Sequence, residues 1–285
     1  MNSMSDTGLP QTGLSHESNW ITSKLFCGIG NRLFQLAAAH TMSKLWSKPL
    51  VFAMPYCSPS EHGDYESIFK LFPLIPKIWK AEAEVSLEQG SVFQHVMLPQ
   101  VAPADRVLLK GCWQAAAYVS DSFTPSWDAI PEKASLLSKW NLTTPLQREK
   151  TAFLHIRLGD YKVLPHHQVN LLTYFATCLE KFPEDTRFLV FSDTMEEARC
   201  LPIFNDRCVF VDEQDELKAL YLMSQCAAGA ITANSTFSWW GAFFARQNLA
   251  DPGSYKAYMP GKWMATCLES TQSIYPTWAT VIPCI

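Results

Sequence analysis

The segment 155–161 carries the most chemically capable side chains in the sequence, with Arg157 placed between His155 and Asp160 directly after an apolar run. A guanidinium is a planar fork of N–H donors that suits a pyrophosphate, and Gly159 lets the backbone turn sharply behind it. Asp160 can orient the guanidinium or bind a sugar hydroxyl. The segment therefore predicts an anion site, with a purely structural Arg157–Asp160 ion pair as the alternative.

Polar side chains also follow two other apolar runs. Asp193 comes after the run 187–191, where it can accept hydrogen bonds from a ribose or a base edge, and residues 234–236 (Asn-Ser-Thr) come after the run 229–233. Ser235 or Thr236 can cap the next helix, whose N-terminal N–H groups form an anion site. The alternatives are a plain turn at Asp193 and a simple helix cap, or a glycosylation acceptor, at 234–236.

These three positions matter together because the second half of the chain alternates apolar runs with amphipathic stretches, which predicts a parallel sheet in a Rossmann-like arrangement. In such sheets ligands bind at the carboxyl ends of the strands. We therefore expect the three polar groups to converge on one crevice. The expected strands are 152–156, 187–191, 208–211 and 229–233, and the expected helices are 169–181, 196–200, 215–226 and 237–246.

The first half shows a similar but weaker pattern. It predicts strands at 21–26, 49–52 and 106–110, a glycine turn at 27–30 and a helix over 31–47. Residues 56–100 give no clear assignment. We divide the chain into a flexible tail (1–20), an N-terminal Rossmann-like domain on the acceptor side (21–135), a polar linker (136–150) and a C-terminal Rossmann-like donor-binding domain (151–285).

Composition limits the possible partners. The 285 residues are 48% hydrophobic and carry a net charge of −4, so no global basic field attracts nucleic acid, and a phosphate-bearing ligand needs a local basic site. The nine cysteines are scattered without zinc-ligand spacing, which favours reduced thiols in the cytoplasm. Without a signal peptide or a membrane-length apolar run, we expect a cytoplasmic protein with at most peripheral membrane contact.

Four segments in this order resemble the α-1,2-fucosyltransferases of glycosyltransferase family eleven. Residues 155–161 resemble that family's His-x-Arg-Arg-Gly-Asp-Tyr motif, and residues 28–35 resemble its Gly-Gly-x-Gly-Asn-x-x-Phe-Gln turn. Residues 215–226 look like its Asp-containing helix with Met-Ser-x-Cys, and residues 233–242 look like its Asn-Ser-Thr-Phe-Ser-Trp-Trp-Gly block. The resemblance runs from about residue 24 to residue 260.

The resemblance implies a GT-B-like α/β fold, in which two Rossmann-like domains face a cleft. It also implies inverting transfer of L-fucose from GDP-fucose, without metal or cofactor, to a galactose-terminated glycan by an α-1,2 linkage, in protein glycosylation or polysaccharide biosynthesis. Arg157 would stabilise the departing GDP, with His155 and Asp160 beside it as the other catalytic candidates. The donor-binding residues implied by position are Gly28, Gly30, Asn31, Arg32, His155, Arg157, Asp193, Asn234, Ser235, Thr236 and Phe237.

Two positions depart from the family pattern. Leu158 stands where a second Arg is usual, so Arg157 acts alone or is helped by Arg32 or Lys162. Cys27 stands where the first glycine of the turn is usual. Inversion also needs a base near the acceptor hydroxyl; Asp160 and His166 are the candidates, and stabilisation of the leaving group alone is a further possibility.

Three other functions compete with this interpretation. The first is transfer of another GDP-sugar, because these motifs recognise phosphates better than the sugar. The second is a non-catalytic protein that binds a GDP-sugar or a glycan on the same fold, which the presence of Arg157 disfavours. The third is an NAD-dependent dehydrogenase, but the chain lacks a Gly-x-Gly-x-x-Gly turn with an acidic residue about 20 positions later.

Overall fold

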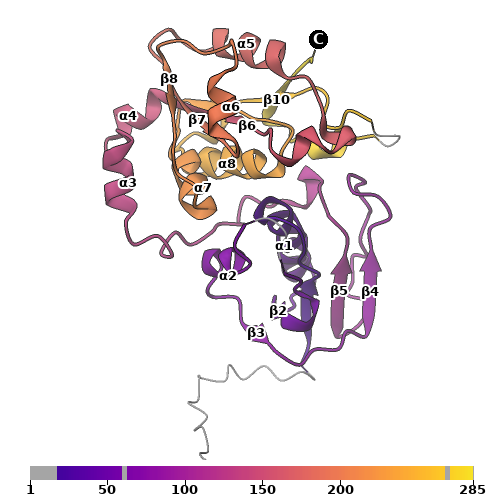
Figure 1. Ribbon diagram of the computed structural model, residues 1–285. Coiled ribbons are helices and arrows are strands. Elements are labelled where there is room, and N and C mark those ends of the chain that lie inside the picture. Colours follow the sequence, from indigo (N-terminus) through magenta and orange to yellow (C-terminus); the bar gives the residue numbers. More distant parts are fainter. Residues whose placement is uncertain (1–17, 60–62, 267–269, 285) are drawn as a thin grey trace, which may run out of the picture.

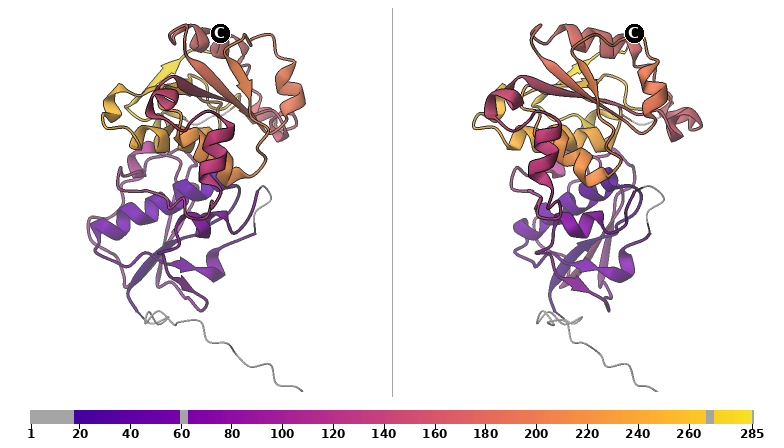
Figure 2. Two further views of the ribbon diagram at one scale, coloured as in Figure 1. Left: turned by 90° about the vertical axis from the view of Figure 1, so that its left-hand side faces the viewer. Right: turned by 60° about the vertical axis from the view of Figure 1, so that its left-hand side comes forward.

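The computed structural model of the protein describes residues 18–59, 63–266 and 270–284. Most of the predicted N-terminal tail, residues 1–17, lies outside this range. Figures 1 and 2 show an N-terminal half (indigo and purple) stacked against a C-terminal half (rose through orange to yellow), with α1, α7 and α8 at their junction.

Every strand pair in the described chain is parallel. The N-terminal half holds a three-stranded sheet of order β1-β5-β4 and a pair β2-β3, and the C-terminal half holds a six-stranded sheet of order β11-β10-β9-β6-β7-β8. The strands are β1 (Trp20–Ser23), β2 (Phe52–Ala53), β3 (Lys77–Ile78), β4 (Val85–Glu88), β5 (Arg106–Lys110), β6 (Thr151–Ile156), β7 (Arg187–Ser192), β8 (Cys208–Phe210), β9 (Gly229–Ile231), β10 (Lys256–Pro260) and β11 (Ala279–Ile282).

Helices cover both faces of the larger sheet. All six residues of β6 are buried, as expected of a central strand in a parallel sheet that is covered on both faces, and four of the six are apolar. Phe153 packs into the core cluster that contains α7 and α8, whereas its neighbour Leu154 packs into the cluster that contains α5. The helices are α1 (Ile29–Leu45), α2 (Ser67–Leu71), α3 (Lys133–Lys139), α4 (Pro145–Glu149), α5 (Leu172–Glu180), α6 (Met195–Arg199), α7 (Glu216–Ser224) and α8 (Thr236–Gln247).

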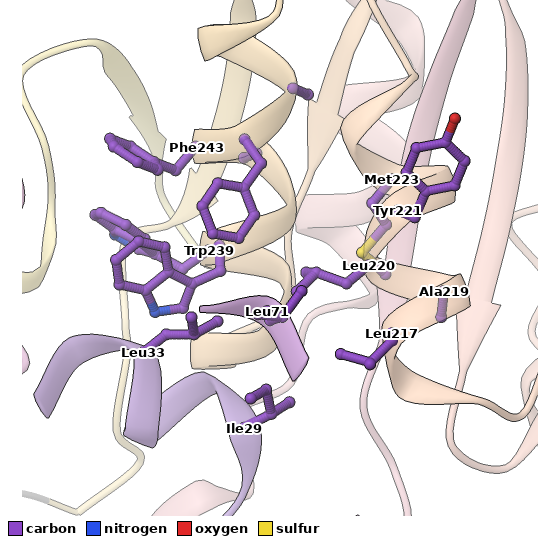
Figure 3. Packing of buried hydrophobic residues seen from close by; sticks show 14 of the residues in the cluster. Ile29, Leu33, Leu71, Leu217, Ala219, Leu220, Tyr221, Met223, Trp239 and Phe243 are labelled. Carbon is purple, nitrogen blue, oxygen red and sulfur yellow. The ribbon is translucent and has the colours of Figure 1, made fainter. Parts of the chain in front are cut away.

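One hydrophobic core joins the two halves. Leu33 of α1 belongs to the same cluster as Leu220 of α7 and Trp239 of α8 (Figure 3). The ring of Phe34 lies 4.6 Å from that of Trp239 and 5.0 Å from that of Trp240, centroid to centroid. Both tryptophans are buried. Because the core is continuous, the division into an N-terminal and a C-terminal domain stays a prediction.

The N-terminal ends of α1 and α8 touch through their backbones. A Cβ atom at Gly30 would lie 2.7 Å from the backbone nitrogen of Phe237 and 2.8 Å from the carbonyl carbon of Thr236. The indole nitrogen of Trp240 donates a hydrogen bond to the Gly30 carbonyl at 3.0 Å. Glycine at position 30 is therefore what allows the two helices to begin side by side.

The predicted elements are present, with shifted ends that have local causes. The helix expected from residue 169 begins at Leu172, because the side chain of Asn170 accepts a hydrogen bond from the Leu172 amide and forms a turn first. The strand expected at 49–52 shortens to Phe52–Ala53, since Leu50 makes only an isolated bridge to Ile21. The unassigned stretch 56–100 contains α2, β3 and β4.

Two further findings concern the described residues. No helix among them is long and apolar enough to cross a membrane. Their cysteines are all free thiols rather than disulfide partners.

The segment 136–150, predicted to be a linker, contains the end of α3 and all of α4. The start of α4 is held by a capping box between Thr144 and Gln147.

We predict that Gly30→Ala destabilises the protein by about 1–3 kcal/mol, because the new methyl group meets backbone atoms that cannot move away. Alanine normally stabilises a helix relative to glycine by up to about 1 kcal/mol, so the sign of the change is informative. The measurement is urea unfolding. Gly90→Ala is the control, since its Cβ meets nothing closer than 3.8 Å; a Gly30→Ala protein as stable as wild type would contradict the helix contact.

Candidate active site

A cleft of about 610 Å³ opens between the two halves at the carboxyl ends of β6, β7 and β9. This volume is in the range of small-molecule sites. The three polar segments that the sequence predicted to converge all line it. The predicted site residues on its wall are Gly28, Gly30, Asn31, His155, Arg157, Asp160, Asp193, Asn234, Ser235, Thr236 and Phe237.

Arg157 is the only Arg or Lys among the described residues that line the cleft. Its Nη2 atom lies 2.7 Å from a carboxylate oxygen of Asp160, and its Nη1 atom lies 3.3 Å from one of Asp193. The guanidinium also sits over the ring of Tyr161. The side chain is a quarter exposed, so it is held in place from several sides while it still faces the cleft.

The backbone after Arg157 folds closely around Asp193. A carboxylate oxygen of Asp193 accepts a hydrogen bond from the Leu158 amide at 2.9 Å. The other carboxylate oxygen lies so close to Gly159 that a Cβ atom there would overlap it. Glycine at position 159 is therefore needed for the close approach of the Asp193 carboxylate as well as for the predicted turn. Asp193 holds this loop in place through its hydrogen bond to the Leu158 amide.

His155 is buried beneath Arg157. Its side chain is 4% exposed, and its ring lies 5.7 Å from that of Phe237. Burial, with a smaller effect of the Arg157 charge, lowers the pKa of His155 to about 3, so its imidazole is neutral near pH 7. Its Nδ1 atom has no hydrogen-bond partner in the described part of the chain. We interpret His155 as a neutral wall residue rather than an acid or base.

Two helices point their N-terminal ends at the cleft. Gly28 is the N-cap residue of α1 and Ser235 is that of α8; neither makes a side-chain capping hydrogen bond, and neither first turn holds an acidic residue. The predicted cap at 235–236 is therefore wrong, because the Thr236 hydroxyl donates to the side chain of Asn31 instead. Uncapped N-termini carry partial positive charge and attract anions.

Asn234 has a structural role in addition to its place on the cleft wall. Its side-chain nitrogen donates to the carbonyl oxygens of His167, at 3.2 Å, and Trp263, at 2.9 Å. The Tyr161 hydroxyl donates to the Asn234 carbonyl at 3.1 Å. Asn234 thereby fixes the segments that carry Tyr161, His167 and Trp263 around the cleft.

Arg32 does not line the cleft, so the structure does not support its predicted contact with the donor. Its guanidinium donates to the carbonyl oxygens of Cys27 and Ser58, both at 2.7 Å, and the side chain is buried. Arg32 therefore stabilises the loop before α1 through these backbone contacts. Lys162 cannot replace the missing second Arg either, because it is paired with Glu197 outside the cleft.

Cys27, the second departure from the family pattern, stands at a position with an unusual backbone conformation. Cys27 has a φ of 63°, in the left-handed region that favours glycine. A glycine would adopt this conformation without strain, which explains why the family's turn has one there. Cys27 adopts this conformation, and its carbonyl oxygen accepts a hydrogen bond from Arg32.

The sequence analysis named His166 as a candidate base but did not predict several other residues of the cleft wall. The rings of Tyr161 and His167 stack at 4.2 Å, and that of His166 lies 4.3 Å from His167. Glu216 lines the cleft and accepts from the Asp64 amide at 3.1 Å; burial raises its pKa. Further missed members are Gln114, Glu213, Trp263 and Met264. Gln114 follows a predicted strand, so its position was a usable signal, whereas Trp263 and Met264 follow β10, which the sequence did not predict.

No group of three or more His, Cys, Asp or Glu side chains that could hold a metal ion occurs among the residues the structure describes. Metal independence nevertheless stays a prediction.

Comparison with known proteins gives the family. The profile described as glycosyl transferase family 11 matches residues 109–251, half of the chain. The chain belongs to glycosyl transferase family 11. The Escherichia coli O-antigen biosynthesis glycosyltransferase WbnK is 34% identical to this family 11 protein over 109 residues, which cover 34% of the chain and 35% of WbnK. The alignment thus spans about a third of that relative.

Among solved structures, fucosyltransferase NodZ from Bradyrhizobium aligns with a TM-score of 0.51 and 12% identity, covering 79% of this chain and 92% of NodZ. At this identity the likeness concerns the fold alone. The family 11 chain has a GT-B-like α/β fold, with parallel sheets in two halves that face a cleft, as predicted.

The neutral state of His155 predicts a pH dependence of stability. Its pKa is about 3 when folded and about 6.5 when unfolded, so the unfolded chain binds more protons between these values. Its contribution to stability is then complete above pH 6.5 and is lost as pH falls toward 3. His40 and His167, whose pKa burial lowers to about 4, act in the same direction.

We predict that His155→Gln reduces the stability lost between pH 7.5 and pH 5.5 by about 1.4 kcal/mol relative to wild type. Urea unfolding at both pH values measures the difference. The control is His95→Gln, at a solvent-exposed histidine, which should lose as much as wild type. An identical pH dependence in His155→Gln would show that His155 is not held neutral.

Proposed function

We propose that this family 11 protein is an inverting, metal-independent fucosyltransferase that transfers L-fucose from GDP-fucose to a galactose-terminated glycan by an α-1,2 linkage. The observation that carries the proposal is the convergence of Arg157 with the uncapped N-termini of α1 and α8 in one cleft. These groups are oriented to bind a diphosphate. The name of the relative WbnK supports a surface polysaccharide as the product, ahead of a glycoprotein.

The chemistry follows from where charge develops. As the acceptor oxygen bonds to the anomeric carbon, the bond from that carbon to the β-phosphate oxygen breaks, and its electron pair leaves on GDP. The negative charge that grows on GDP would be stabilised by the Arg157 guanidinium and by helix N–H groups, which need no reorganisation during the reaction. This arrangement could do without a metal ion.

The proton of the acceptor hydroxyl needs a base. Of the two candidates, Asp160 already forms an ion pair with Arg157 at 2.7 Å, which suits a role in holding the guanidinium in place. His166 lines the cleft, and its ring packs on that of His167, which in turn stacks on Tyr161. A neutral imidazole has one nitrogen free to accept a proton. We therefore assign the base role to His166 and a positioning role to Asp160.

Two alternatives fit the same cleft. A transferase for another GDP-sugar would use the same diphosphate contacts, and a binding protein without activity would need no base. The donor that binds and the presence of turnover separate these possibilities.

The first experiment measures donor binding by calorimetry with EDTA present, using GDP, GDP-fucose, GDP-mannose, UDP-galactose and NAD. We predict that wild type binds GDP and GDP-fucose and that Arg157→Ala weakens both by about 10–100-fold, the effect of losing a hydrogen bond to a charged group. Arg106→Ala is the control, since Arg106 pairs with Glu84 at 2.8 Å outside the cleft. Absence of GDP binding by folded wild type would refute the proposal.

We predict that His166→Ala keeps donor affinity but lowers kcat by about 100-fold or more, the usual contribution of a general base. Free imidazole should restore part of the rate, because it can enter the space left by the side chain. The assay follows GDP release with lactose as acceptor, and His95→Ala with the same imidazole is the control. Full activity without imidazole would exclude His166 as the base.

A further inference from the structure

The side-chain oxygen of Asn31 receives two hydrogen bonds from opposite halves of the molecule. Gln114 donates from its Nε2 atom and Thr236 donates from its hydroxyl, each at 2.9 Å. Gln114 follows β5 in the N-terminal half, and Thr236 begins α8 in the C-terminal half. The carboxamide of Asn31 therefore lies at the joint between α1, α8 and the end of β5.

This arrangement fixes which way the Asn31 amide faces. Because both donors occupy Oδ1, the Nδ2 group is directed away from them, and it makes no hydrogen bond with any described residue. Asn31 is partly exposed and lines the cleft. Two N–H donors thus remain for a ligand, beside the N-terminus of the helix that Asn31 belongs to.

Gln114 is itself held rigidly. The residue is 6% exposed, and its backbone N–H donates to the Val92 carbonyl at 3.2 Å. The preceding Trp113 has a left-handed φ of 55°, and its amide donates to the side chain of Gln89 at 2.6 Å. This turn, in which Gly111 also has a positive φ of 144°, brings the Gln114 side chain to Asn31 rather than to solvent.

We infer that Gln114 is a positioning residue that orients Asn31 so that the Asn31 amide donates hydrogen bonds to a phosphate oxygen of the sugar-nucleotide donor. The inference rests on the proposed function. Ionised phosphate oxygens accept hydrogen bonds, so an amide turned the other way would present its own oxygen to them and be repelled. Gln114 thus contributes to donor binding only through Asn31. Both residues belong to the N-terminal half, whereas Arg157 belongs to the C-terminal half.

A double-mutant cycle tests this dependence, with GDP affinity measured by calorimetry on wild type, Gln114→Leu, Asn31→Ala and the double variant. We expect Gln114→Leu to weaken GDP binding about fivefold and Asn31→Ala about tenfold or more, as for hydrogen bonds to a charged ligand. Because Gln114 acts through Asn31, the double variant should bind within about twofold of Asn31→Ala. Additive losses, or an unchanged Gln114→Leu, would overturn the inference.

Gln247→Leu is the matched control. Its side chain donates to the Asp121 carbonyl at 2.8 Å and so also joins α8 to the N-terminal half, but away from the cleft. We expect unchanged GDP affinity in this variant. A loss equal to that of Gln114→Leu would show that any contact between the halves has the same effect, which would refute a specific orienting role.

Asn31→Asp provides a second test that preserves shape. Aspartate keeps an oxygen for Gln114 and Thr236 but replaces the donor with a second, charged acceptor. We expect weaker binding of GDP by at least tenfold, with guanosine affinity unchanged because guanosine has no phosphate. Equal effects on both ligands would overturn the inference alone, whereas a wild type that binds no GDP would refute the proposed function and this inference with it.

Discussion

The cleft depends on the contact between the backbone of Gly30 and the first turn of α8. The carbonyl of Gly30 accepts from Trp240, and the Phe34 ring one turn later packs on Trp239 and Trp240. This contact therefore lies at the boundary between the hydrophobic core and the polar cleft. It sets two helix N-termini next to each other, where their partial charges add, and it places Asn31 within reach of Thr236. A side chain at position 30 would separate all of these groups.

Much of the fold could be predicted because the deciding signals are local. The run 152–156 is apolar apart from His155 and forms most of the central strand β6, and the aromatic run that follows Ser235 forms the buried helix α8. Predictions were poor where long-range pairing decides the structure. Strands β2 and β3 have two residues each and exist because they pair with each other, and β4 alternates exposed and half-buried residues beside β5. Single-sequence periodicity contains no information about such partners.

The site was predictable at strand ends and less so elsewhere. Topology alone brings Arg157, Asp193 and Asn234 to one edge of the sheet, and the structure places them there. Arg32 shows the limit of carrying a role over by position, because it belongs to the right motif but its side chain turns toward backbone carbonyls under the loop. The stacked rings of Tyr161 and His167 arise from a short irregular segment whose path is set by tertiary hydrogen bonds from Asn234. No pattern within the segment encodes that path.

The pairing of Arg157 with two carboxylates has a consequence for the release of product. The guanidinium has two counter-ions within the protein itself, Asp160 and Asp193. Under the proposed function, a diphosphate would compete with these carboxylates for the guanidinium, so its net affinity would be the difference between two ion pairings rather than the full strength of one. On release of the nucleotide product, the carboxylates would pair with the guanidinium again, and no unpaired charge would remain. A site built in this way holds its ligand moderately and empties readily, which favours repeated turnover over tight storage.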